Sequence, residues 1–202
     1  MGASRLTLRR AVFLDRDGVL NYNIHNPSTG AFEAPPTPAQ FQLIPGVITA
    51  LLELQEAGFL LFLVSNQPDY AKGKNSLVSL TAIHRRLEEA LTEARVSFAG
   101  FNYCFHHPEG VIPAYSGPCR CRKPSPYFLL RARDQFMLDM RQSWMIGDRL
   151  TDVECGQAAG VKTILVGTMA SQTGSPHTLS SDYVADDLFA ATKIVLREEL
   201  LC

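Results

Sequence analysis

Short apolar runs alternate with longer amphipathic stretches along most of the chain. Apolar runs that stop abruptly at polar or glycine residues are typical of buried strands in a parallel sheet. The expected strands span residues 11–15, 60–66, 101–105, 143–147, 163–167 and, with a weaker pattern, 182–185. Each run is followed by polar residues, so the strand ends are the first places to look for chemistry.

Apolar residues at helical spacing predict helices between and after these strands. They span residues 47–57, 76–95, 126–137, 150–159 and about 187 to the end. We expect Pro45 in the first turn of the first helix, and Gly58 and Gly160 as closing residues. Strand–helix alternation with strands rich in Val, Ile and Leu predicts an α/β fold, a Rossmann-like parallel sheet with helices on both faces.

Two segments lack a periodic pattern and are expected to be loops. The stretch 23–44 is rich in proline and follows the first strand end, while 168–181 is rich in Ser, Thr, Gly and Pro. The first segment either covers a site as a specificity loop or is a plain surface connection, and the pattern favours neither.

Composition narrows the class of protein. A chain of 202 residues with 46% hydrophobic residues predicts a single domain over 1–202 with an ordinary core. No apolar run is long enough to cross a membrane, and the first ten residues lack the apolar core of a signal peptide. Five cysteines without a secretion signal suggest a reducing, cytoplasmic location. The net charge of −1 argues against nucleic-acid binding, and we expect a monomer that acts on a small molecule.

The first strand ends in the sequence Asp15-Arg16-Asp17-Gly18. Ligands of open α/β sheets bind at the carboxyl ends of the strands. Two carboxylates at such an end can hold a hard divalent cation, or divide the roles of nucleophile and general acid. The alternative is a simple Asp-Gly turn.

Polar residues also follow the second strand, as Ser65-Asn66-Gln67. A hydroxyl and two amides there can donate hydrogen bonds to phosphate oxygens, or they can merely cap a turn. Further along, the pair Arg122-Lys123 precedes Pro124, which we expect to start a helix and so to place positive charge at an anion-binding helix end.

The fourth strand ends in Gly147-Asp148, and Asp152 follows four residues later. On the helix expected there, the two acids would share one face, with one able to bind a metal and the other behind it. An N-cap acid with a first-turn acid is the alternative.

Four soft metal ligands lie in two pairs that flank a loop rich in Gly and Pro. The pattern Cys104-Phe105-His106 followed by Cys119-Arg120-Cys121 offers three thiolates and an imidazole, which predicts a closed, structural Zn²⁺ site over 104–121. His107 is a possible substitute for His106, but the spacing favours His106. Cys155 and Cys202 are expected to have no part in this site.

Together, an acid pair, a hydroxyl, a lysine and a second acid pair stand in order at strand ends. In this arrangement the chain resembles the haloacid dehalogenase superfamily of phosphohydrolases over roughly residues 11–190. The Cys/His loop that leads into Arg122-Lys123-Pro124 is similar to the D,D-heptose 1,7-bisphosphate phosphatase and histidinol-phosphatase branch. That resemblance implies a small enzyme without a large cap domain.

The residues that match this branch are Phe13 to Gly18, Asn21, Pro45-Gly46-Val47, Ser65-Asn66-Gln67, Cys104 to Pro108, Cys119 to Pro124 and Gly147-Asp148. Heptose phosphatases usually have Thr at the position of Ser65 and Lys at the position of Arg149. They also usually have Ser-Gly-Ile-Ala-Arg-Gly where this chain has residues 68–73. These differences lie in segments that recognise the substrate. The resemblance therefore defines the phosphoryl-transfer reaction better than it defines the leaving group.

The resemblance implies a mechanism through an aspartyl-phosphate. Asp15 would be the nucleophile and Asp17 the general acid and base. Mg²⁺ would be held by Asp15, the backbone carbonyl of Asp17 and Asp148, with Asp152 supporting this site from behind. Ser65 and Lys123 would bind the phosphoryl oxygens. The other expected substrate contacts are Asn21, Asn66, Gln67, Arg122 and Arg149.

The resemblance implies D-glycero-D-manno-heptose 1,7-bisphosphate as the substrate, with hydrolysis at the 7-phosphate. Histidinol phosphate or another small phosphate ester is the alternative within the same chemistry. A polynucleotide 3′-phosphatase is disfavoured by the near-neutral charge and the lack of a basic–aromatic patch. A binding module without catalysis is disfavoured because every motif position is filled.

Overall fold

The computed structural model describes residues 8–167 and 181–200. Its centre is a six-stranded sheet in which neighbouring strands run parallel, in the order β5-β4-β1-β6-β7-β8. The strands are β1 (Ala11–Leu14), β4 (Leu60–Asn66), β5 (Phe98–Cys104), β6 (Trp144–Gly147), β7 (Lys162–Val166) and β8 (Tyr183–Ala185). The predicted α/β class and its parallel sheet are confirmed; the largest shift is at β5, which begins at Phe98.

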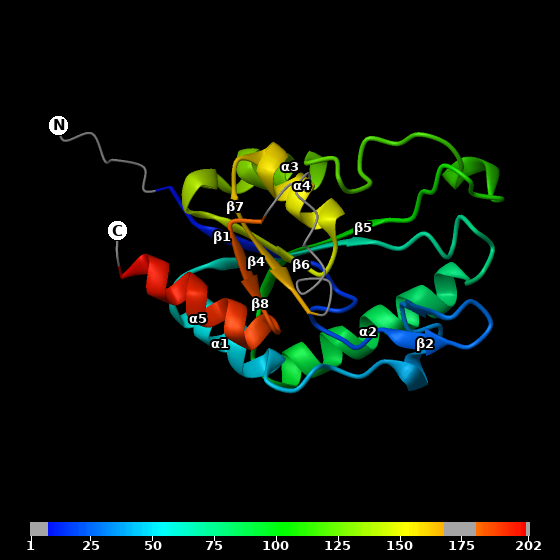
Figure 1. Ribbon diagram of the computed structural model, residues 1–202, viewed down its shortest axis with the longest axis horizontal. Coiled ribbons are helices and arrows are strands. Elements are labelled where there is room, and N and C mark those ends of the chain that lie inside the picture. Colours follow the sequence, from blue (N-terminus) through cyan, green and yellow to red (C-terminus); the bar gives the residue numbers. More distant parts are fainter. Residues whose placement is uncertain (1–7, 168–180, 201–202) are drawn as a thin grey trace.

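Helices cover both faces of this sheet, as the alternating pattern predicted (Figure 1). Three pack on one face: α1 (Val47–Glu56), α2 (Leu77–Glu93) and α5 (Leu188–Glu199). Two pack on the other: α3 (Tyr127–Phe136) and α4 (Leu150–Ala159). Among the described residues, no helix is long and apolar enough to pass through a bilayer.

Strand β1 lies between the two hydrophobic layers and takes part in both. Successive strand residues point to opposite faces, so Val12 and Leu14 join the layer under α1, α2 and α5, whereas Phe13 joins the layer under α3 and α4. All three side chains are fully buried. Burying one side chain of this size contributes about 1.5–3 kcal/mol, which fixes the strand that carries the first acidic motif.

The proline-rich segment 23–44 is more ordered than the sequence predicted. It contains a hairpin of β2 (Ile24–Asn26) and β3 (Ala31–Glu33), followed by the short 3-10 helix η1 (Pro38–Gln40). Lys74 Nζ lies 3.3 Å from Glu33 Oε1, and the Asn75 side chain donates to the Pro36 carbonyl at 2.9 Å. These contacts attach the segment to the loop after β4.

Two prolines do not start helices as expected. Helix α1 begins at Val47 after Gly46, whose φ of 84° is a left-handed conformation suited to glycine, so Pro45 lies outside the helix. Helix α3 begins at Tyr127 with Pro126 as its cap, so Pro124 also precedes the helix. The loop expected at 168–181 lies outside the described residues except for Ser181.

The strand order determines where a site can form. From β1 the chain builds outward through β4 and β5, and then returns to place β6 on the other side of β1. Such a reversal leaves a crevice at the carboxyl ends of the strands. The loop 104–121 and the β2–β3 hairpin extend from this same end of the sheet (Figure 1).

Candidate active site

Asp15 is the first residue after β1 and lies at the carboxyl edge of the sheet. It is only 7% exposed. Its Oδ1 accepts the Arg16 backbone N–H at 2.7 Å and lies 3.0 Å from Lys123 Nζ. Both contacts hold the same carboxylate oxygen, so the strand and the lysine together fix the direction of this side chain.

Lys123 comes from the loop before α3, and its ammonium group is buried among oxygen atoms. Nζ lies 2.6 Å from Asp152 Oδ1 and donates to the Val64 carbonyl at 2.7 Å, besides its contact with Asp15. Burial alone would lower the pKa of Lys123, but the two carboxylates outweigh burial and raise it. The lysine therefore remains a cation inside the site.

Asp148 and Asp152 do not share a helix face, which corrects the prediction. Asp148 lies between β6 and α4, whereas Asp152 is in the first turn of α4 and accepts the Arg149 backbone N–H at 3.0 Å. The two acids nevertheless meet, because oxygen atoms of Asp15, Asp148 and Asp152 lie within 4.8 Å of one another. Burial and the neighbouring Asp15 raise the pKa of Asp148 to about 7, and burial raises the pKa of Asp152 to about 6.

This acidic cluster fits a hard divalent cation. Asp148 Oδ1 is buried without a hydrogen bond to the described residues. Carboxylate oxygens of this kind are the ligands that hard divalent cations prefer. Gly18, with a φ of 82°, lies against the other oxygen, since an added Cβ would be 2.3 Å from Asp148 Oδ2. Asn23 Nδ2 donates to that oxygen at 3.3 Å. Glycine thus keeps open the space in front of a carboxylate that has one oxygen without a hydrogen bond to the described residues.

Asp17 lies beside this cluster, but its carboxylate is held by a separate set of donors. Arg16 donates from Nε to Oδ1 at 3.1 Å and from Nη2 to Oδ2 at 3.0 Å. Asn21 donates to Oδ1 at 3.0 Å, and Gln67 donates to Oδ2 at 2.6 Å. Asn21 and Gln67, expected to contact substrate, are thus buried behind Asp17 and serve to hold it.

The remaining predicted residues have distinct places. Ser65 ends up buried at the edge of β4, where its Oγ accepts from the Gln67 side chain at 3.0 Å. Asn66 holds the backbone of Lys123, accepting its N–H at 3.0 Å and donating to its carbonyl at 3.1 Å. Asn66 therefore connects the end of β4 to the loop that supplies the lysine.

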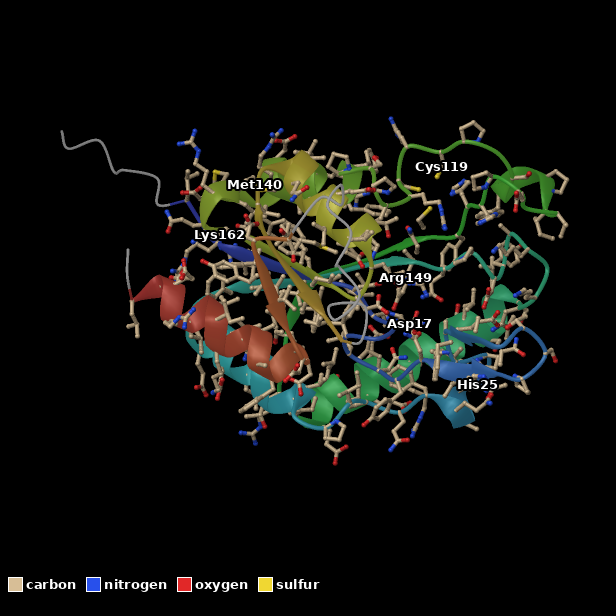
Figure 2. All side chains as sticks on the ribbon, in the orientation of Figure 1. Asp17, His25, Cys119, Met140, Arg149 and Lys162 are labelled. Atoms are coloured by element: carbon tan, nitrogen blue, oxygen red, sulfur yellow. The ribbon has the colours of Figure 1, made fainter. Side chains whose placement is uncertain are left out.

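Two arginines are more accessible. Arg122 is half-buried and donates to the His106 carbonyl at 3.2 Å. The Arg149 side chain is 60% exposed, with its Nε 3.8 Å from Asp148 Oδ1. Figure 2 labels Arg149 and Asp17, both of which lie toward the carboxyl ends of the central strands. Both arginines are therefore placed to meet a group that arrives from solvent.

Cys104, His106, Cys119 and Cys121 form a second potential metal cluster, at the base of the loop in the upper right of Figure 2. Their Sγ atoms are 3.3, 3.6 and 3.7 Å apart, and His106 Nδ1 lies 3.7 and 3.8 Å from two of them. Tetrahedral zinc with Zn–S bonds of about 2.3 Å would separate sulfur atoms by about 3.8 Å. The expected four ligands are thus at zinc-binding distances, whereas His107 lies outside the cluster.

The three thiols of this cluster differ in their surroundings: burial raises the pKa of Cys104 and of Cys121, whereas the pKa of Cys119 is lowered. Burial raises the pKa of the Cys119 thiol, but hydrogen bonds from the backbone N–H groups of Cys121 and Arg122 outweigh burial and lower it. Donors of this kind favour a thiolate, which is the form that binds metal. In the same loop, the N–H groups of Val111 and Ile112 donate to the Ala71 carbonyl at 2.7 and 3.1 Å. The Cys/His loop is thus attached to the loop after β4.

Sequence reasoning assigned no role to Arg16, Asn23 or Tyr103. Arg16 is only 1% exposed and lies over the ring of Tyr103, with Cζ 5.8 Å from the ring centroid. An arginine between two acids at the end of a buried strand was the available signal. Asn23 and Tyr103 carried no comparable signal, because their contacts depend on chain segments far away in sequence.

Comparisons with known proteins agree with this arrangement. A family model described as HAD-hydrolase-like matches residues 120–191. The D-glycero-beta-D-manno-heptose-1,7-bisphosphate 7-phosphatase of Escherichia coli (strain K12) is 37% identical over 180 residues, 87% of this chain and 86% of the relative. The enzyme of the same name from Vibrio cholerae serotype O1 is 39% identical over 179 residues, 87% of this chain and 88% of the relative.

A solved structure is similar over nearly the full chain. The D,D-heptose 1.7-bisphosphate phosphatase from B. bronchiseptica, complexed with magnesium and phosphate, matches with a TM-score of 0.75 and 27% sequence identity. The match covers 94% of this chain and 99% of that one. Identities of 37% and 39% over most of both sequences establish common descent with the curated enzymes. The chain therefore belongs to the D-glycero-beta-D-manno-heptose-1,7-bisphosphate 7-phosphatase family of haloacid dehalogenase-like phosphatases.

Proposed function

We propose that this protein is a Mg²⁺-dependent phosphatase that removes the 7-phosphate of D-glycero-D-manno-heptose 1,7-bisphosphate. The observation that carries the proposal is the buried contact of Asp15 with Lys123 beside Asp148 and Asp152. A carboxylate held between a cation and a metal-binding acid cluster suits attack on phosphorus, because charge is balanced on both sides. The choice of substrate rests on the names of the related enzymes.

The reaction would take place in two displacements at phosphorus. In the first, a carboxylate oxygen of Asp15 bonds to phosphorus, the bond to the sugar oxygen breaks, and that oxygen takes a proton from Asp17. In the second, water attacks phosphorus and Asp17 takes a proton from the water. The bond between Asp15 and phosphorus breaks, which regenerates the free carboxylate and yields inorganic phosphate. Lys123 and the Ser65 hydroxyl would bind the phosphoryl oxygens in both steps.

Magnesium would be held by Asp15, Asp148 and the backbone carbonyl of Asp17. When bound, it would neutralise charge on the phosphoryl group and orient it toward Asp15. Asp152 would act from behind, through the Lys123 ion pair at 2.6 Å and the Arg149 backbone N–H. The presence of magnesium and phosphate in the related B. bronchiseptica structure supports this assignment.

Zinc would occupy the Cys104, His106, Cys119 and Cys121 cluster as a structural ion. Four protein ligands leave no open position for a substrate or a catalytic water. The loop contacts Ala71, in the loop after β4, and continues directly into Arg122-Lys123. Its role would be to fix both of these segments.

Arg122 and Arg149 are the proposed contacts for the rest of the substrate. Their guanidinium groups are less buried than Lys123, and a planar fork suits a second phosphate or neighbouring hydroxyls. Asn66 would contribute by fixing Lys123. The protein would act as a single domain, because the two hydrophobic layers share the central strands. Its monomeric state stays a prediction.

The test is incubation of purified protein with the heptose 1,7-bisphosphate and Mg²⁺, followed by phosphorus NMR. We expect the 7-phosphate signal to disappear while the 1-phosphate stays. Asp15→Asn keeps the shape but removes the nucleophile, so turnover should fall by more than about 1,000-fold with an unchanged circular dichroism spectrum. Loss of the 1-phosphate first, or substantial activity of Asp15→Asn, would contradict the proposal.

A further inference from the structure

All four acceptor positions of the Asp17 carboxylate are filled by described side chains. Each oxygen of a carboxylate has two lone pairs. Oδ1 accepts from Arg16 Nε and Asn21, while Oδ2 accepts from Arg16 Nη2 and Gln67. Arg16 alone contacts both oxygens, and it also donates from Nη2 to Gln67 Oε1 at 2.9 Å. Arg16, Asp17 and Gln67 thus form a closed ring of hydrogen bonds.

We propose that Arg16 is a positioning residue, which orients the Asp17 carboxylate for proton transfer to the leaving oxygen and keeps it out of the neighbouring acid cluster. The inference rests on the proposed function, in which Asp17 is the general acid and base. It assigns to Arg16 a role that acts through Asp17 and not through contact with substrate.

Such a device is needed because Asp17 lies two residues from Asp15. A carboxylate free to rotate there could bind the cation itself, and would then be lost for proton transfer. The metal-binding cluster found in the described residues contains Asp15, Asp148 and Asp152 but not Asp17. A bidentate guanidinium fixes both the position and the plane of a carboxylate, which a single donor cannot do.

Arg16 itself is held immobile. Its side chain is 1% exposed and lies over the Tyr103 ring, whose hydroxyl is 3.0 Å from His84 Nδ1. Burial opposes the charge of Arg16, but Asp17 and Tyr103 outweigh burial and raise its pKa. Burial also raises the pKa of Tyr103 to about 12, so this support stays neutral. The Arg16 guanidinium therefore stays charged and is held in place by the Tyr103 ring.

The two amides, in contrast, each have a second acceptor at hand. Gln67 Nε2 is 3.0 Å from Ser65 Oγ, and Asn21 Nδ2 is 3.0 Å from the Tyr22 carbonyl. Either amide can therefore release Asp17 without being left unpaired. The freed position on Asp17 can then carry the proton that passes to the leaving oxygen, while Arg16 still holds the orientation of the carboxyl group.

The experiment compares two ester types in Arg16→Lys, which keeps the charge but loses the fork. A sugar oxygen leaves as a strong base and needs a proton from Asp17, whereas p-nitrophenolate is a weak base and does not. We expect kcat/KM for glycerol 2-phosphate and the heptose bisphosphate to fall on the order of 100-fold. For p-nitrophenyl phosphate it should change by less than about 5-fold.

A second measurement addresses the water-attack step. Because that step needs Asp17 for every substrate, Arg16→Lys should show a rapid burst of p-nitrophenolate followed by slow turnover. Arg10→Lys is the matched control, since Arg10 lies at the opposite end of β1 and contacts the Ala57 carbonyl at 2.9 Å. It should leave the ratio between ester types unchanged.

Equal losses for both ester types would show that Arg16 only supports the fold, and no loss for either would show that the fork is not needed. Both results overturn the inference. If Arg16→Lys does not fold, Gln67→Met breaks the same ring and should show the same bias toward aryl esters. The inference about Arg16 is judged on the ratio of kcat/KM between variant and wild type with glycerol 2-phosphate. If the wild-type protein fails to hydrolyse the heptose bisphosphate, that result contradicts the proposed function and not the role of Arg16.

Discussion

Asp148 is a carboxyl group whose surroundings favour the protonated form. It is largely buried beside Asp15 and Asp152, and one of its oxygens has no hydrogen bond to the described residues. Burial and this negative surrounding raise its pKa to about 7. An unfolded Asp loses its proton near pH 4, so the folded chain binds an extra proton between these values.

The sign of the resulting pH dependence follows directly. A raised carboxyl pKa stabilises the metal-free fold at low pH, and this stability is lost as the pH rises from about 4 to about 7. A bound cation needs the ionised carboxylate, so the stabilisation by Mg²⁺ should grow over the same range. Thermal unfolding of the zinc-loaded protein without added Mg²⁺ should show a falling Tm between pH 5 and 8, and the gain from added Mg²⁺ should be larger at pH 8.

Asp148→Asn is the control for this pair of measurements. It cannot ionise, so the metal-free Tm at pH 8 should rise, by about 2–4 °C for each kcal/mol regained in a chain of this size. The gain from Mg²⁺ should shrink in the same variant. An equal Mg²⁺ effect at pH 5 and pH 8 in the wild-type protein would contradict the account of Asp148.

The residues of the site could be predicted where they lie at the carboxyl end of a strand. Asp15, Ser65 and Asp148 each follow an apolar run, and parallel strands place such ends at one edge. The direction of Asp17 could not be predicted, because it depends on Gln67 and on the path of Asn21 behind it. Contacts between distant loops leave no periodic signal in the sequence.

The loop 104–121 is the clearest case of an element that depends on a ligand. It has no strand or α-helix of its own beyond the end of β5 and the 3-10 helix η2 (Pro113–Tyr115). Replacing His106 by Ala removes one of the four ligands, so bound zinc should fall from about one per chain toward zero. The Tm should fall by at least about 5 °C, because structural zinc contributes to folding directly.

His107→Ala is the matched control, since this histidine is the next residue and shares the loop. Its Nδ1 accepts the Glu109 backbone N–H at 3.1 Å and takes no part in the Cys/His cluster. Zinc content should be unchanged in this variant when both proteins are measured by plasma mass spectrometry. Zinc loss from His107→Ala alone, or a wild-type protein without zinc, would refute the assignment.

Elements with a long periodic pattern were predictable, and those defined by turns were not. Helix α4 has the predicted bounds, and α1, α2 and α3 differ by one or two residues at their ends. The β2–β3 hairpin was missed because each strand has only three residues, and prolines lie in the turn between the strands and shortly after β3. The role of Pro124 as a helix start was wrong, although the predicted start of α3 at residue 126 is only one residue from the observed start at Tyr127.

The order of the strands could not be read from the sequence, although the class of fold could. Alternation of strand and helix is compatible with several parallel arrangements, and only packing decides between them. The observed order places β1 between β4 and β6, so the acids of β1 and β6 face each other across the switch point. Lys123 then enters from the loop before α3 and completes the site.

The charges around the complete site bear on the choice of substrate. Arg122 and Arg149 offer accessible cations, whereas Glu33 is already paired with Lys74 at 3.3 Å. Histidinol phosphate carries a cationic amine, which would meet like charge there, while a bisphosphate brings a second anion. One charge-assisted hydrogen bond contributes about 1.5–3 kcal/mol, or about 10- to 150-fold in binding.

We therefore expect kcat/KM for the heptose 1,7-bisphosphate to exceed that for histidinol phosphate by at least about 10-fold under identical Mg²⁺. Arg122→Ala should reduce this preference mainly through a higher KM, because the remote phosphate binds equally in the ground and transition states. Arg131→Ala, an exposed arginine on α3, should leave the preference unchanged. A preference for histidinol phosphate would reassign the substrate and leave the aspartyl-phosphate chemistry of Asp15 intact.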